Sequence, residues 1–171
     1  MNKRIYIILV LFQICSINSA FAETSVTVGF SPHGQAIDLV LQAIEAANQT
    51  IEVAAYNFTS PKIAFALAEA ERRGVKVRIL LDKKSNAHGH PSTDTVLAVH
   101  IPVRLNGHYA IMHDKYMIID RSIVETGSFN YTASAEKRNA ENALIIKGDK
   151  DLAGEYLNNW EKLWSEGESF Q

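Results

Sequence analysis

The stretch from residue 113 to residue 130 gathers side chains that could attack and hold a phosphate group. It contains His113, Lys115, Asp120, Ser128 and Asn130, and the last two belong to a Gly-Ser-x-Asn turn. An imidazole can act as a nucleophile, an ammonium group offsets phosphate charge, and hydroxyl and amide groups donate hydrogen bonds to oxygen. The set predicts a phosphate-directed site, and the stretch occurs once in the chain.

The spacing within this stretch predicts which side chains lie together. In an extended chain, residues two apart point to the same face, so His113 and Lys115 share one face. Ser128 and Asn130 are also two apart, and Gly127 before them can adopt backbone conformations that other residues resist. If the two strands are neighbours, we expect both pairs to meet at one strand end, where α/β folds build their sites.

The chemistry of a phosphodiester assigns expected roles to these groups. A neutral, correctly oriented imidazole of His113 can attack phosphorus, while Lys115 and Asn130 offset the charge on the phosphate oxygens. Glu141 is our candidate for the carboxylate that orients the imidazole, and Asp120 is the other acid at hand, for which we expect a supporting hydrogen-bonding role. We therefore group His113, Lys115, Asp120 and Glu141 as catalytic residues, and Lys115, Ser128 and Asn130 as phosphate-binding residues.

The elements that must position these residues follow from hydrophobic periodicity. Apolar strands alternate with amphipathic helices, which predicts an α/β/α sandwich with helices on both faces of a mixed sheet. Ser60, Pro61 and Gly74 predict the start and end of the second helix. The expected strands are 26–30, 50–56, 75–81, 102–105, 115–120, 123–126 and 143–147. The expected helices are 34–47, 61–73, 92–100, 131–137 and 151–166, with a polar loop over 82–91.

The first 22 residues are typical of a secretory signal peptide. Lys3 and Arg4 precede a short apolar run, and Ala20-Phe-Ala22 is a small-x-small cleavage pattern. The apolar run is too short for a comfortable membrane span, which needs about 20 residues, although an uncleaved anchor is the alternative. We expect residues 23–171 to form one exported domain, periplasmic or else extracellular, without stable membrane association. The only cysteine, Cys15, lies in the signal segment, so no disulfide is expected.

The charge balance argues against a broadly basic nucleic-acid surface. The chain has 17 basic and 19 acidic residues, and removal of Lys3 and Arg4 with the signal peptide would widen the acidic excess. Because Lys and Arg normally supply most non-specific affinity for nucleic acid, any basic surface must be local.

The polar loop over 82–91 admits three interpretations. His88 and His90 form a His-x-His pair that can chelate a metal, but no carboxylate or cysteine cluster supports such a site. Lys83 and Lys84 could contact a phosphate backbone. The third interpretation is an ordinary solvated loop. We expect no metal ion and no cofactor.

The stretch 113–130 resembles the signature of the phospholipase D superfamily, His-x-Lys-(x4)-Asp-(x6)-Gly-Ser-x-Asn, and matches it without departure. Further segments are similar to the small bacterial endonucleases of this superfamily that carry one signature: 28–32 (VGFSP), 54–59 (AAYNFT), 124–132 (VETGSFNYT) and 139–143 (NAENA). The resemblance implies an α/β/α sandwich with its signature region at about 108–135. It also implies that His113 is the nucleophile, that Lys115, Ser128 and Asn130 hold the phosphate, that Glu141 pairs with His113, and that cleavage needs no metal.

A single signature predicts a homodimer with a shared active site. One histidine cannot at the same moment attack phosphorus and protonate the leaving oxygen from the opposite side, and a twofold dimer would supply the second histidine. We expect a metal-independent endonuclease that cleaves DNA, with RNA as an alternative substrate, with little sequence preference and through a phosphohistidine. The alternatives are a phospholipid hydrolase, for which we find no exposed apolar loop in the sequence, and a non-catalytic DNA-binding protein of the same fold.

Overall fold

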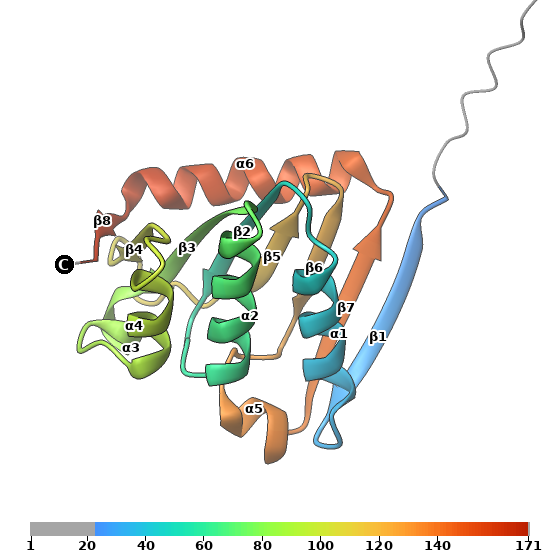
Figure 1. Cartoon of the computed structure of the whole chain (residues 1–171), viewed down its shortest axis with the longest axis horizontal. Helices are drawn as coiled ribbons and strands as arrows, with labels where there is room; N and C mark the ends of the chain where they lie inside the picture. The colour runs from blue at the N-terminus through green and yellow to red at the C-terminus, as the bar shows by residue number, and fades with distance from the viewer. Residues whose placement is uncertain (1–22, 171) are drawn as a thin grey trace, which may run out of the picture.

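The computed structural model describes residues 23–170. Strands and helices alternate along the chain, and the strands form one eight-stranded mixed sheet (Figure 1). The predicted signal peptide lies outside the described residues. The strand order is β1-β7-β6-β5-β2-β3-β4-β8. The strands are β1 (Ser25–Ser31), β2 (Thr50–Ala55), β3 (Lys76–Asp82), β4 (Val103–Asn106), β5 (Lys115–Ile119), β6 (Ile123–Gly127), β7 (Glu141–Lys147) and β8 (Glu168–Ser169).

The sheet has a parallel half and an antiparallel half. Strands β2, β3 and β4 run parallel to one another, because helices connect them across one face. Strands β5, β6, β7 and β1 form an antiparallel ladder, and β5 pairs antiparallel with β2 in the middle of the sheet. The start of β5, the end of β6 and the start of β7 therefore lie together at the same edge of the sheet, the edge that is formed by strand ends.

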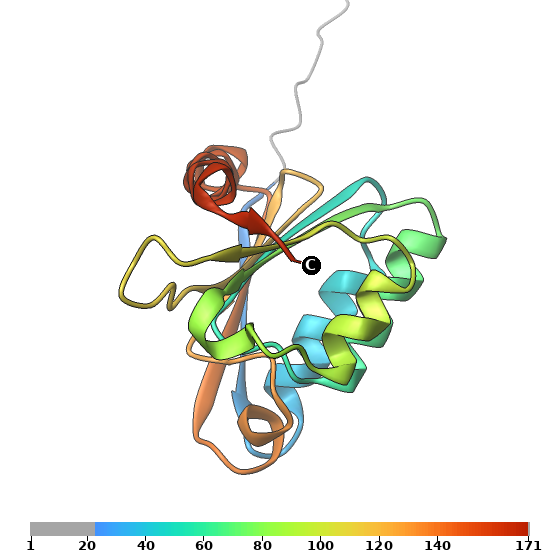
Figure 2. The same ribbon diagram turned by 90° about the vertical axis from the view of Figure 1, so that its left-hand side faces the viewer.

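Helices cover both faces of the sheet, as the sequence predicted (Figure 2). Helices α1 (Gln35–Glu45), α2 (Pro61–Arg72) and α4 (Pro91–Leu97) lie on one side, where the larger apolar core forms against β2, β3, β5 and β7. The long helix α6 (Lys150–Glu166) lies on the other side and packs on β4, β2, β5 and β6. Trp160 of α6 is fully buried there, and its indole N–H donates to the Val53 carbonyl at 2.9 Å.

Local signals fix the helix boundaries. Ser60 caps α2 by accepting a hydrogen bond from the Ile63 amide, Pro61 occupies the first turn, and Gly74 follows the helix with φ of +94°. Asp149 caps α6 in the same way. The predicted second and last helices are confirmed within one residue at each end.

Two short elements were not predicted. Helix α3 (Lys83–Asn86) begins inside the expected polar loop, because the Asp82 carboxylate caps it by accepting from the Ser85 amide at 2.8 Å. Strand β8 is two residues long and pairs with β4, too short for a periodicity signal. The predicted helix over 131–137 is shorter than expected and forms α5 (Ala133–Lys137), capped by Thr132. Across residues 23–170, no helix combines the length and the apolarity that a membrane span requires.

Candidate active site

Strand β5 positions His113 and Lys115 at the edge of the sheet. Lys115 opens the strand opposite Ala55 of β2, and the Asp114 carbonyl accepts from the Tyr56 amide at 3.0 Å. The Lys115 ammonium donates to the His113 carbonyl at 2.5 Å and lies 5.2 Å from the centre of the Tyr56 ring. The exposed imidazole of His113 lies 4.5 Å from the same ring. Tyr56 therefore contacts both groups and limits where they can point.

The end of β6 brings the Gly-Ser-x-Asn turn to the same edge. The register that pairs Tyr116 with Thr126 sets Lys115 level with Gly127, and Gly127 pairs with Ala143 of β7. A side chain at Gly127 would collide with the Asn142 carbonyl, so only glycine fits there. That carbonyl accepts from the Ser128 amide at 3.1 Å and from the Phe129 amide at 3.2 Å. The predicted meeting of the two strand ends is present.

Glu141 joins this group from the start of β7, but its partners differ from those expected. Its carboxylate accepts from the Ser128 hydroxyl at 2.6 Å and from the Asn139 amide group at 2.9 Å. Within residues 23–170 the imidazole of His113 makes no hydrogen bond, so the Glu141–His113 pair stays a prediction. The Ser128 hydroxyl already donates its hydrogen to Glu141, so this hydrogen bond must break before Ser128 can donate to a phosphate. The Ser128 oxygen also accepts from the Asn142 amide at 3.1 Å.

The environment of the Lys115 ammonium favours the binding of an anion beside it. Only 8% of Lys115 is exposed, and this burial lowers the pKa of its ammonium group. The carboxylates of Asp114 and Glu141 oppose that effect and raise the pKa. A buried cation is costly until it is neutralised, so a phosphate anion placed here would gain from the interaction.

A cleft of about 380 Å³ opens between the strand edge and α6. One wall carries signature residues, and the other carries side chains of α6 that the sequence did not place at the site. The Asn159 amide group donates to the Tyr116 hydroxyl at 2.9 Å, and the Tyr116 and Tyr156 rings meet edge to face at 5.0 Å. Only the spacing of Tyr156 and Asn159 on one helix face could have suggested this wall. The lining residues are His113, Asp114, Lys115, Tyr116, Thr126, Gly127, Glu155, Tyr156 and Asn159.

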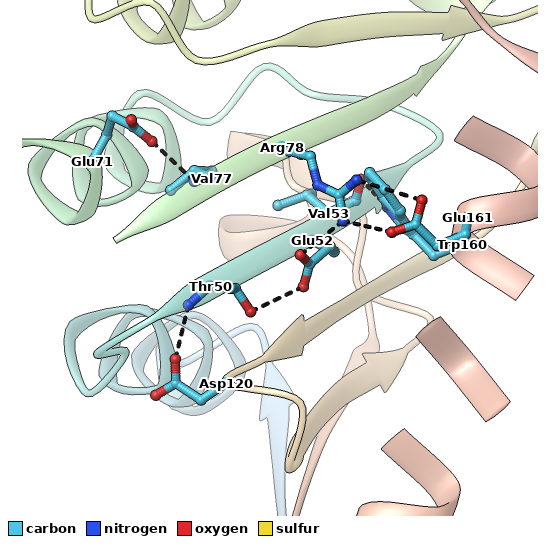
Figure 3. Close-up of polar contacts among 9 residues, drawn as sticks. All are labelled: Thr50, Glu52, Val53, Glu71, Val77, Arg78, Asp120, Trp160 and Glu161. Atoms are coloured by element: carbon cyan, nitrogen blue, oxygen red, sulfur yellow. Dashed lines mark hydrogen bonds and ion pairs between the residues drawn. The ribbon is translucent and has the colours of Figure 1, made fainter. Parts of the chain in front are cut away.

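Asp120 lies at the opposite end of β5 from the other predicted catalytic residues. At about 3.4 Å per residue, five residues place it roughly 17 Å from Lys115. Its carboxylate accepts from the backbone amides of Asn48, Gln49 and Thr50, at 2.9, 2.7 and 3.0 Å (Figure 3 shows the Thr50 contact). These contacts agree with the supporting hydrogen-bonding role and separate Asp120 from the catalytic group in which we placed it.

Replacement of Asp120 by alanine is expected to cost about 1–3 kcal/mol of unfolding free energy, because three amides lose a charged acceptor at a partly exposed site. Although burial opposes it, hydrogen bonding from these amides lowers the pKa of Asp120 below 3.8. The stabilisation is therefore present above pH about 4 and is lost as the pH falls through the folded-state pKa. Urea unfolding at pH 7 and at pH 3 measures the difference, which should shrink in acid. An equal difference at both pH values would contradict this account.

The loop residues weighed as alternatives have structural partners. His90 caps α4 by accepting from the Ser92 amide at 3.1 Å, and no group of three metal-binding side chains occurs in the described part of the chain. Lys84 donates to the Ala110 carbonyl at 2.8 Å and so holds the segment that leads to His113. Lys83 pairs with Glu168 at 2.6 Å. These contacts weaken the metal and phosphate-backbone interpretations.

A second polar group was not predicted. Glu125 of β6 and Tyr131 are both buried, and the Tyr131 hydroxyl donates to the Glu125 carboxylate at 2.5 Å. The available signal was a lone acid within the apolar run of this strand. On the opposite face of the sheet, Arg78 bridges Glu52 and Glu161 and lies 4.4 Å from the centre of the Trp160 ring (Figure 3). That cluster lies outside the cleft and is structural.

Comparisons with known proteins agree with this geometry. Residues 40–164 match the family model described as "Cardiolipin synthase, PLD-like domain". The crystal structure of Nuc from Salmonella typhimurium, described as a phospholipase D family member, is 42% identical with a TM-score of 0.83, covering 87% of this chain and 99% of that one. NucT from Helicobacter pylori is 27% identical with a TM-score of 0.76, covering 86% and 100% of the two chains. A protein named phospholipase D from Rickettsia prowazekii is 39% identical over 142 residues, which are 83% of this chain and 69% of the relative.

Proposed function

Because this chain belongs to the phospholipase D superfamily and has the fold of a phosphodiesterase from that family, we propose that it is a metal-independent endonuclease that hydrolyses DNA with little sequence preference. RNA is an alternative substrate. The observation that carries the proposal is the meeting of His113, Lys115, Ser128 and Glu141 at one edge of the sheet. The likeness to Nuc over nearly the whole of both chains favours a nuclease.

The proposed reaction has two steps. A ring nitrogen of His113 attacks phosphorus and forms a phosphohistidine, while the bond to the leaving oxygen breaks and that oxygen takes a proton. Water then attacks phosphorus, loses its proton to a base, and the phosphorus–nitrogen bond breaks to restore the imidazole. Lys115 and Asn130 offset the charge on the phosphate oxygens throughout, and no metal enters either step.

The proton donor and base would come from a second copy of the chain. The sheet face beside α6 leaves room for it: Val26, Val28 and Phe30 of β1 are 60, 48 and 55% exposed. These three side chains lie level with alternate residues of β7, and those residues lie level with residues of β6 whose side chains face α6. The apolar strip formed by Val26, Val28 and Phe30 therefore faces the same side of the sheet as the cleft. Exposed apolar surface of this kind is typical of an interface. We propose that the strip forms part of the dimer interface.

A phospholipid hydrolase is the second candidate function. The relatives named phospholipase D favour it, and so does the segment before His113, in which Tyr109 and Ile111 are 36% and 47% exposed. This exposure was not predicted from the sequence. Two apolar side chains beside a catalytic histidine could enter a lipid surface, or they could contact the second subunit. We favour the contact with the second subunit over insertion into a lipid surface.

We also propose that the protein is exported to the periplasm.

Substrate assays in EDTA test the proposal. Residues 23–171 are incubated with plasmid DNA, and in parallel with phosphatidylcholine and cardiolipin vesicles. We expect nicking and linearisation of the plasmid in excess EDTA, no lipid head-group release, and loss of both DNA products in the His113→Ala variant. Head-group release with intact DNA would favour the lipid hydrolase. DNA binding without cleavage of either substrate would favour a non-catalytic protein.

A further inference from the structure

Glu125 is a buried acid that no step of the proposed reaction uses. It lies in the centre of β6, level with Met117 of β5 and Ile145 of β7, and it is 1% exposed. Directly opposed residues share a face of the sheet, so its side chain enters the apolar core beneath α1 and α2. Among the described residues no cation pairs with it. A valine or isoleucine would fill such a position at lower free energy.

Among residues 23–170, the Glu125 side chain hydrogen-bonds to Tyr131 alone, and Tyr131 follows the phosphate-binding turn. The Tyr131 hydroxyl donates to Oε2 of Glu125 at 2.5 Å, and Oε1 is buried without a partner in the described part of the chain. Burial raises the pKa of Glu125 to about 8, which keeps the group largely protonated at neutral pH. A proton on Oε1 leaves Oε2 free to accept, so the hydrogen bond to Tyr131 persists without a buried charge.

Tyr131 is fixed from its backbone as well. Its carbonyl accepts from the amides of Thr59 and Ser60 at 2.9 and 2.8 Å, and it bridges to Phe58. The segment from Gly127 to Asn130 therefore lies between Glu125 of β6 and Tyr131. The side chains of Glu125 and Tyr131 are hydrogen-bonded to each other. The bond closes the loop that carries Ser128 and Asn130. Within residues 23–170, Oδ1 of Asn130 is also buried without a hydrogen-bond partner.

We propose that Glu125 and Tyr131 are a positioning pair, whose buried hydrogen bond holds the Gly127–Asn130 turn in the geometry that binds the transferred phosphate. The inference rests on the proposed phosphoryl-transfer function and names residues outside the signature. Neither residue touches the substrate. The role requires an acceptor at position 125 and a donor at position 131, and it does not require a charge.

Four variants test the pair, with a chromogenic phosphodiester as substrate and unfolding free energy measured in parallel. Tyr131→Phe and Glu125→Leu each remove one partner, and we expect kcat/KM to fall on the order of 10- to 100-fold, as for other small misplacements of a catalytic group. Glu125→Gln retains an acceptor and should stay within about threefold of wild type. The double variant Glu125→Leu/Tyr131→Phe removes both partners, which is nearly neutral or stabilising for folding. Its kcat/KM should fall no further than in either single variant.

The matched control is Glu52→Gln, a buried acid on the opposite face that pairs with Arg78. It should lose stability and keep kcat/KM within about twofold, because it lies outside the turn. A stable double variant with wild-type kcat/KM would overturn the inference, and so would a Glu125→Gln variant as impaired as Glu125→Leu.

Hydrogen exchange separates this inference from the proposed function, since it needs no substrate. The amides of Ser128 and Phe129 donate to the Asn142 carbonyl and report on the turn. We expect their exchange to accelerate at least tenfold in Tyr131→Phe and to be unchanged in Glu52→Gln. A wild-type protein that cleaves no phosphodiester would contradict the function, whereas unchanged exchange in Tyr131→Phe would contradict the pair.

Discussion

His113→Ala is expected to lower kcat for phosphodiester cleavage by more than about 10⁴-fold while leaving the fold intact. A general acid or base alone contributes about 10²–10⁴-fold, and His113 is proposed to act as nucleophile in one subunit and as acid and base in the other. The side chain is exposed and makes no hydrogen bond within the described residues, so its removal should cost little stability. Single-turnover cleavage of plasmid DNA in EDTA, together with thermal unfolding, measures both quantities.

His88→Ala provides the matched control, because His88 is also exposed and lies after α3, in the loop that leads to α4. It should retain wild-type kcat. The phosphorus–nitrogen bond of a phosphohistidine is labile in acid and stable in alkali, so labelled substrate quenched in alkali should leave label on the wild-type protein and none on His113→Ala. Residual activity of His113→Ala within about 100-fold of wild type would rule out the nucleophilic role.

The signature could be assembled from the sequence because its residues sit on neighbouring antiparallel strands. Side-chain alternation fixed the shared face of His113 and Lys115, and a short turn between β5 and β6 made the two strand ends neighbours. The fold class followed from the same periodicity. Asp120 was grouped with the catalytic residues although a supporting hydrogen-bonding role was expected for it, because its actual partners are backbone amides about 70 positions earlier in the chain, which local patterns do not reveal.

Other parts of the site depend on contacts that local patterns do not encode. The α6 wall of the cleft requires knowing which helix face meets which strands, and Tyr156 looked like any apolar position of an amphipathic helix. The Ser128–Glu141 hydrogen bond depends on the register of β6 against β7, and Glu125 became informative only when its burial and its bond to Tyr131 were seen. The exposed strip of β1 likewise looked like an ordinary short apolar strand, with nothing in the sequence to indicate its exposure.

That strip leads to the second prediction of large effect, since a shared site makes activity depend on pairing. We expect Val28→Asp to produce a folded monomer without detectable cleavage, because an ionised side chain would be buried at the interface while the free strand tolerates it. Sedimentation and cleavage assays measure the two outcomes on the same sample. Full specific activity in a monomer would contradict the shared site. A comparison with Thr27→Asp, on the opposite face of β1, controls for the added charge.

Mixing subunits gives a quantitative form of the same test. If each dimer has one site that needs His113 from both subunits, random exchange of wild type with a ninefold excess of His113→Ala should reduce wild-type activity to about one-tenth, because nearly all wild-type chains then occupy mixed dimers. Independent sites in each chain would leave the activity unchanged. A saturating small phosphodiester prevents the inactive chains from competing for substrate, and mass spectrometry verifies exchange. A His113→Ala/Val28→Asp chain, which cannot pair, should not inhibit, and this contrast would locate the loss of activity in the dimer rather than in the excess protein.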